Sequence, residues 1–230
     1  MTVQELHTAF KFGLDKLDSL NYPSIEPEEI DLLLNQAQDR YVKQRYGINN
    51  NKRQSFEETQ KRTDDLKKLV FNVIITPAAN ASDNKPYGRF VTLPNTVGSE
   101  YWFAIEEECD ITYFNCHNVS TTVRATVIPR THDDYRKLIK DPFNKPDIYE
   151  IFRLMENGRV ELISNVNITI GDYYLRYIKK PLRIDLNTNI TCELSEHTHQ
   201  EIIDEAIKIA LEAIEAPRTP TFDKIITTTE

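Results

Sequence analysis

Four acidic side chains crowd into one short stretch near the middle of this 230-residue chain: Glu106, Glu107, Glu108 and Asp110. Carboxylate oxygens are the ligands that Mg²⁺ and Ca²⁺ prefer, so this cluster with a nearby histidine fits a metal-dependent hydrolase or nuclease. Consecutive carboxylates also repel one another, which is typical of a solvated segment, a channel lining or a contact with a basic partner. The second interpretation is favoured, and the hydrolase stays open as the alternative.

Histidine and cysteine residues supply two further candidate sites. Cys192, His197 and His199 could bind a metal, but no Cys-x-x-Cys motif accompanies them, and residues two apart on a helix point to different faces. Cys116 and His117 could support nucleophilic catalysis, but adjacent residues on a strand face opposite ways. We interpret all five as capping, turn or surface residues.

Signatures of nucleotide or acyl chemistry are missing from the sequence. It contains neither a Gly-x-x-x-x-Gly-Lys phosphate loop nor a Gly-x-Ser-x-Gly elbow, and only six glycines. We therefore predict no catalytic residue, no cofactor and no metal, and the chain is not expected to be an enzyme.

A stretch from Asp172 to Pro181 combines tyrosines with basic residues. Single-strand nucleic-acid grooves use such a combination, and Tyr174, Tyr177 and Lys179 would then stack on bases and neutralise phosphates. Tyrosine and arginine are equally enriched in protein interfaces. Because the patch is small and the chain is acidic, we favour a contact with a subunit or partner through Tyr173, Tyr174, Arg176, Tyr177, Lys179 and Lys180.

Composition places the chain among ordinary globular proteins, with 40% hydrophobic and 28% charged residues. A net charge of −8 disfavours a protein whose main task is to grip phosphate backbones. No apolar run approaches the roughly 20 residues that cross a bilayer, so no membrane partner is expected. The three cysteines lack paired spacing, which favours a reducing compartment.

Amphipathic helices are predicted at both ends of the chain. Apolar residues recur at helical spacing over 3–20 and 27–46, and Ser55 with Glu58 forms a capping box for a third helix ending near residue 70. Ser195 can cap a final helix that runs to about residue 215. Two prolines then indicate an extended arm, in which the predicted contact residues are Arg218, Phe222, Ile225 and Ile226.

Short β-branched or aromatic runs fill the middle of the chain and predict strands. The Asn157-Gly158 pair is a strong signal for a two-residue hairpin turn, and Thr131 can cap a short helix over 132–139. The predicted strands are 71–76, 89–93, 101–105, 111–115, 121–128, 148–155, 159–163 and 173–178.

These elements predict an α+β fold. The helices of 1–70 and 194–216 are expected to form one helical bundle, because helices that flank a β segment can pack together and leave it as a separate lobe. An antiparallel β lobe, 71–193, is then inserted into the bundle, and 217–230 forms an extended C-terminal docking arm.

Three segments resemble the head-to-tail connector, or ring, proteins of short-tailed bacteriophages, and those of crAss-like phages above all. They are the opening Glu28–Gln38, the aromatic strand Asp172–Pro181 and the helix start Cys192–Ile203. The resemblance covers both helical ends, and the β middle by its layout.

The resemblance implies a structural virion protein of the neck and tail region, made in the cytoplasm of the bacterial host. Such proteins assemble as a closed ring, usually of twelve copies, between the portal protein and the other rings of the neck and tail. Genomic DNA passes through the centre during ejection, without sequence-specific binding. In this family a terminal arm docks on an adjacent protein, and that role is carried over to 217–230 alone.

Overall fold

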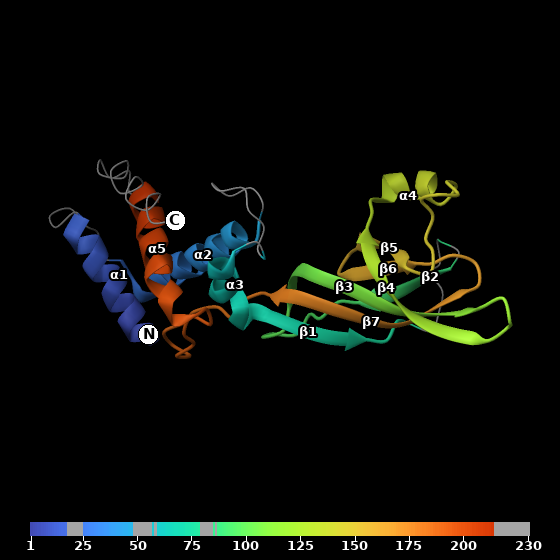
Figure 1. The fold of residues 1–230 in the computed structure, drawn as a ribbon. Coiled ribbons are helices and arrows are strands. Elements are labelled where there is room, and N and C mark those ends of the chain that lie inside the picture. The colour runs from blue at the N-terminus through green and yellow to red at the C-terminus, as the bar shows by residue number, and fades with distance from the viewer. Residues whose placement is uncertain (18–24, 48–56, 58, 79–84, 86, 214–230) are drawn as a thin grey trace. The chain divides into compact units, whose positions relative to one another are not determined.

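The computed structural model describes residues 1–17, 25–47, 57, 59–78, 85 and 87–213. Helices and strands are both well represented, which confirms the predicted α+β class. The chain divides into two compact units (Figure 1). The β unit is Val70–Lys180, and the helical unit combines the segments before and after it. The predicted arm over 217–230 lies outside the described residues.

Apolar stripes hold the described helices of the helical unit together. Helix α5 packs against both α1 and α2, as the alternation of apolar and polar residues on each helix allows. The α-helices of this unit are α1 (Val3–Leu17), α2 (Pro27–Tyr46), α3 (Gln60–Leu66) and α5 (His199–Ala213). Their buried residues include Leu6, Phe10, Ile30, Leu34, Ile203 and Ile207.

Local sequence sets both ends of α2. Pro27 occupies the start of the helix, where its missing N–H is not needed. Glu26 and Glu29 form a reciprocal capping box, in which the Glu26 N–H donates to Glu29 Oε2 at 3.0 Å. Gly47 ends the helix by donating its N–H to the Lys43 carbonyl at 2.9 Å.

The third helix is shorter than predicted. Its capping box at Ser55 and Glu58 lies outside the described residues. Helix α3 ends at Leu66, a 3₁₀ turn covers Lys67–Leu69, and Val70 already belongs to a strand. The β-branched residue at position 70 therefore begins the sheet and does not extend the helix.

Ser195 stands at the predicted N-cap, but its hydroxyl has another partner. A 3₁₀ turn, Glu196–Thr198, separates it from α5. The Ser195 hydroxyl donates to the carbonyl of Asp64 at 3.1 Å and does not accept from the helix that follows. The residue thereby ties the start of the last helix to α3.

Seven strands form one curled sheet in the order β1-β7-β3-β4-β5-β6-β2. Six of the eight predicted strands match observed ones, and the other two are parts of a single strand. The strands are β1 (Val70–Ile75), β2 (Gly88–Thr92), β3 (Tyr101–Phe114), β4 (Ser120–Pro129), β5 (Glu150–Glu156), β6 (Arg159–Ile163) and β7 (Ile168–Lys179).

The prediction of a wholly antiparallel lobe is wrong at one pairing. Strands β4 and β5 run parallel, with Thr126 opposite Glu150 and Val127 opposite Ile151. Parallel neighbours cannot be joined by a tight hairpin, and here the connection contains helix α4 (His132–Leu138). Thr131 caps α4 as predicted, accepting from the Asp134 N–H at 3.3 Å.

Strand β3 is the longest element of the sheet, with 14 residues. The predicted strands 101–105 and 111–115 join through the acidic stretch between them, because arginines on the neighbouring strands β4 and β7 pair with its outward carboxylates. Asn157 and Gly158 have positive φ values of 38° and 73° and make the predicted turn from β5 to β6.

The sheet curls until its two edges approach each other. The N–H of Ala78, just beyond β1, donates to the carbonyl of Phe90 on β2 at 2.8 Å. The curl encloses a core from most of the strands, which includes Val91, Ile111, Val127, Ile151, Leu162, Tyr173, Leu175 and Tyr177.

An extended segment, Pro181–Glu193, follows β7 and packs on α2 in the helical unit. Asn35 donates to the Ile184 carbonyl at 2.9 Å and accepts from the Ile184 N–H at 2.8 Å. Gln38 donates to the Leu182 carbonyl at 3.0 Å. Among the described residues, no helix is both long and apolar enough to cross a membrane.

Candidate interaction surface on the outer face of the sheet

The acidic stretch of β3 does not form a metal clamp. Side chains alternate between the two faces of a strand, so Glu106, Glu108 and Asp110 point outward while Glu107 points into the core. In the part of the chain that the structure describes, no three His, Cys, Asp or Glu residues are grouped to bind a metal. The described residues therefore do not form the metal site that the hydrolase alternative requires.

Glu107 is a structural residue of the core, with 8% of its surface exposed. Arg153 Nη1 lies 2.6 Å from Glu107 Oε1, and the Tyr173 hydroxyl donates to Oε2 at 2.7 Å. Burial raises the pKa of Glu107, and the positive charge of Arg153 opposes that rise. The pair and its hydroxyl partner link β3, β5 and β7 inside the curl.

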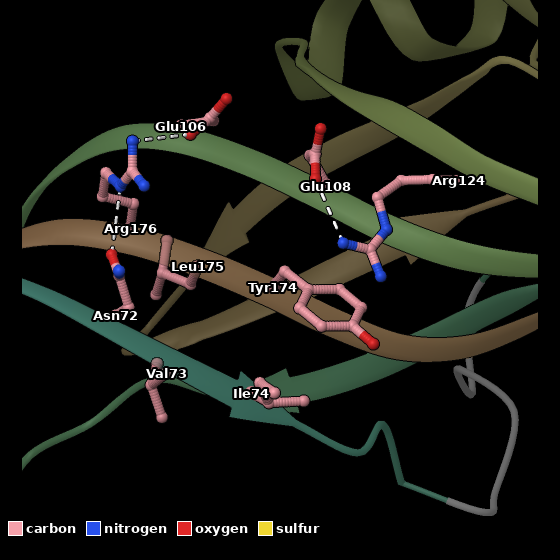
Figure 2. Close-up of a pocket in the computed structure, with 9 residues that line it drawn as sticks. All are labelled: Asn72, Val73, Ile74, Glu106, Glu108, Arg124, Tyr174, Leu175 and Arg176. Carbon is pink, nitrogen blue, oxygen red and sulfur yellow. Dashed lines mark hydrogen bonds and ion pairs between the residues drawn. The ribbon is translucent and has the colours of Figure 1, made fainter.

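Two arginines neutralise the outward carboxylates (Figure 2). Arg176 on β7 lies 3.1 Å from Glu106 Oε2, and its Nε donates to the Asn72 side chain at 3.1 Å. Arg124 on β4 lies 3.0 Å from Asp110 Oδ1 and 3.5 Å from Glu108 Oε2. The acidic run thus supplies the negative side chains of a series of cross-strand ion pairs, which we call the charge ladder.

Tyr174 joins this ladder as an aromatic platform. The guanidinium of Arg124 lies 3.7 Å from the centre of its ring, within the range of a cation–π contact. Its hydroxyl donates to Asp110 Oδ2 at 2.9 Å, and this hydrogen bond raises the pKa of Tyr174. One tyrosine therefore connects the positive and negative partners of the ladder.

A hollow lies among these groups, and the exposed Ile74 supplies its outward apolar side chain (Figure 2). The carboxylates of Glu106 and Glu108 on its rim are already paired with arginine. A general base needs a carboxylate or imidazole that is free to take a proton, and the rim offers its acids as ion pairs. The hollow therefore suits a contact with another protein surface better than catalysis.

The residues predicted as partner contacts fall into three groups. Tyr173, Tyr177 and Lys179 are buried inside the subunit, where the Tyr177 hydroxyl donates to the Ser99 carbonyl at 2.7 Å and Lys179 Nζ donates to the Gly98 carbonyl at 3.0 Å. These three offer almost no area to another protein, and the burial of Tyr177 and Lys179 removes two of the three residues of the nucleic-acid platform considered above. Tyr174, Arg176 and Lys180 reach the surface; Arg218, Phe222, Ile225 and Ile226 lie outside the described residues.

Strand alternation accounts for the three buried side chains among the predicted contacts. Tyr173, Tyr177 and Lys179 belong to one series of alternate positions on β7, which also includes Leu175, and all four side chains are buried. The period of two was visible in the sequence. Because both faces of β7 carry tyrosine, composition alone did not separate the inner from the outer residues.

The histidine and cysteine candidates have structural partners. His199 is buried and its Nε2 lies 3.2 Å from the Leu194 carbonyl, while burial lowers its pKa. His197 Nε2 lies 2.8 Å from Asp65 Oδ1, a carboxylate with no exposed surface. Burial also raises the pKa of the Cys192 thiol to about 11. The His197–Asp65 contact therefore joins the turn before α5 to α3.

The outward acids of β3 are thus ion-paired, and Tyr174, Arg176 and Lys180 are the predicted contact residues that reach the outer face. The chain belongs to the phage tail ring protein 3/4 family, whose model matches residues 1–220. It is also similar to "Ring protein 4/5" of Bacteroides phage crAss001, with 27% identity over 234 residues, which cover 91% of this chain and 92% of that protein.

These comparisons confirm the resemblance to crAss-like ring proteins. The chain is a structural component of a phage virion and not an enzyme. Its family indicates that it assembles into a ring with other tail proteins. The metal-dependent hydrolase is therefore set aside.

Proposed function

We propose that this chain is the subunit of a head-to-tail connector ring, placed in the neck between the portal protein and the tail. The ring would close from twelve copies, and genomic DNA would pass through it during ejection. The observation that carries this proposal is the match of the ring-protein family over residues 1–220. Weak pairwise contacts suffice in such an assembly, because ring closure makes the last contacts intramolecular.

The charges on the outer face of the sheet support a conduit that does not bind DNA. The arginines on the outer face of the sheet, Arg124 and Arg176, are already paired with carboxylates. Counterion release from DNA requires clusters of cations that are available to phosphates. An acidic chain with a net charge of −8 instead keeps the polymer from adhering as it moves.

Two parts of this proposal rest on the sequence. The N-terminal helices and α5 would form the bundle that contacts neighbouring subunits, and 217–230 would dock on an adjacent protein of the neck. An extended arm adds contact area without a second rigid body. Arg218, Phe222, Ile225 and Ile226 would provide its contacts, with Tyr174, Arg176 and Lys180 as contacts of the β unit.

Assembly of the purified chain tests the proposal. Mass photometry, with and without the portal protein of the same phage, should reveal a closed oligomer; twelve copies of a 26.8 kDa chain give about 320 kDa. Labelled duplex DNA should bind it weakly at physiological salt. Monomers alone in the presence of the portal, or tight DNA binding that falls steeply with salt, would contradict the connector role.

A further inference from the structure

A cationic and aromatic projection follows helix α4 in the β unit. We call the segment Arg136–Lys145 the basic knob. It contains Arg136, Lys137, Lys140 and Lys145, all exposed, and a single acidic residue, Asp141. Phe143 stands among these cations with 93% of its surface exposed. The sequence predicted a short helix over 132–139 and gave no reason to expect a contact there.

Hydrogen bonds order the knob in the isolated chain. The N–H of Phe143 donates to Asp141 Oδ1 at 3.0 Å, and Asn144 donates to Oδ2 at 2.6 Å. The Lys145 N–H donates to the Asp141 carbonyl at 3.1 Å. Both carboxylate oxygens of Asp141 therefore already accept hydrogen bonds within the knob. A projecting phenylalanine on an ordered loop has already lost part of the entropy that binding would otherwise cost.

The cations of the knob also differ in state from the ion-paired arginines of the sheet. Arg124, Arg153 and Arg176 each pair with a carboxylate of the sheet. Lys137 lies 4.0 Å from Asp134, whereas Arg136, Lys140 and Lys145 have no ion-pair partner within the described ranges. The knob therefore presents positive charge that the described sheet does not balance.

The complementary surface occurs on the same chain. Residues 70–180 contain 13 Lys and Arg against 14 Asp and Glu, whereas the remaining residues contain 15 against 22. In the described part of the helical unit, α5 carries Asp204, Glu205 and Glu212, which we call the acidic face of α5. Arg40 Nη1 lies 3.6 Å from Glu205 Oε1 and Gln200 donates to Asp204 Oδ1 at 2.9 Å, but α5 as a whole has four acidic residues against one lysine, so it keeps a net negative charge.

We propose that the basic knob of one copy docks on the acidic face of α5 of the next copy around the ring. The inference rests on the proposed ring. A ring closes through a heterologous interface, which needs two different and complementary patches on one chain, and the knob and the acidic face are such a pair. Duplex DNA fits the knob less well than α5 does. Asp133 and Asp134 next to the knob repel phosphates, and duplex phosphates offer no pocket for Phe143.

A charge-swap experiment on the full-length chain tests this contact. The knob variant carries Arg136→Glu, Lys140→Glu and Lys145→Glu, and the helix variant carries Asp204→Lys and Glu212→Lys. The matched control reverses three exposed cations elsewhere, Arg130→Glu, Arg159→Glu and Arg183→Glu. Each variant is first compared with the parent chain by thermal unfolding, which should change little because the knob residues are exposed.

Native mass spectrometry then measures ring formation by each variant and by an equimolar mixture. We expect each swapped variant alone to associate at least tenfold more weakly than the parent chain, and the control to form rings normally. The mixture should form rings of alternating composition, since every interface then joins opposite charges. Phe143→Ala should also weaken association, because it removes the apolar centre of the contact.

Several results would overturn the inference and still leave the connector role in place. Rings of normal stability from the knob variant would do so, as would a mixture that fails to assemble. Intact rings that have lost binding to the portal or to labelled DNA would assign the knob to that partner. A parent chain that forms no ring with the portal present would contradict the proposed function itself, and this inference with it.

Discussion

Neighbouring glutamates on β3 carry the same chemical group into opposite environments. Glu108 is on the outer face, where its pairing with Arg124 at 3.5 Å competes with water. Glu107 meets Arg153 at 2.6 Å inside the curl. Exposed ion pairs contribute about 0–1 kcal/mol, whereas removal of one partner from a buried pair costs about 3–5 kcal/mol. Stability therefore depends on one of the two carboxylates.

Substitutions along β3 should show this difference. Glu107→Ala leaves Arg153 without its counter-charge and should lower the free energy of unfolding by about 3–5 kcal/mol. Tyr173→Phe removes one hydrogen bond and should cost about 1 kcal/mol, and Glu108→Ala about 0.5 kcal/mol or less. Denaturant unfolding followed through Trp102, the one tryptophan of the chain, reports on β3 itself. Equal losses for Glu107→Ala and Glu108→Ala would contradict the assigned roles.

The elements that sequence patterns predicted best are the long amphipathic helices, because a period of 3.6 residues over many turns has no competing explanation. The strands were placed correctly wherever turn residues bounded them, as at Asn157-Gly158. Two features depended on tertiary partners. The acidic middle of β3 is strand because arginines on β4 and β7 pair with it, and Pro181–Glu193 is held by side chains of α2. Neither partner is near in sequence.

In the candidate interaction surface, too, the sequence predicts one part and the tertiary structure decides the other. An aromatic and basic strand could be predicted as important from its residues alone. The curl of the sheet decides which residues reach the surface, since it turns Tyr173 and Tyr177 inward and leaves Tyr174 and Arg176 outside. Curl arises from pairings among strands distant in the chain, which local propensity does not encode.

The packing of α1 on α5 depends on a glycine. A Cβ added to Gly13 would overlap with Ile207 Cδ1, the end of a flexible side chain. Gly13→Val should therefore force Ile207 out of its present rotamer and lower the stability of the helical unit by about 1–3 kcal/mol, measured by circular dichroism at 222 nm. Adding Ile207→Ala should recover part of this loss, although Ile207→Ala alone costs about 2–5 kcal/mol. Strictly additive effects would show that the two residues do not meet.

At the scale of the whole molecule, the β unit has the properties of an insertion that can fold alone. Its ends lie together, because Val70 is opposite Ile178 in the β1–β7 pairing. All seven strands and the residues of its core fall within Val70–Lys180. Cutting the chain at both junctions therefore leaves the sheet and its register complete.

A fragment of residues 70–180 should fold by itself, giving dispersed amide signals in a ¹H–¹⁵N spectrum and one cooperative transition through Trp102 fluorescence. A longer fragment, 70–193, is the matched control. Its extra residues use α2 side chains as partners, including Gln38 and Asn35, so they should give sharp signals typical of unfolded chain. A collapsed spectrum for 70–180 that recovers dispersion only in 70–193 would show instead that Pro181–Glu193 is required by the sheet.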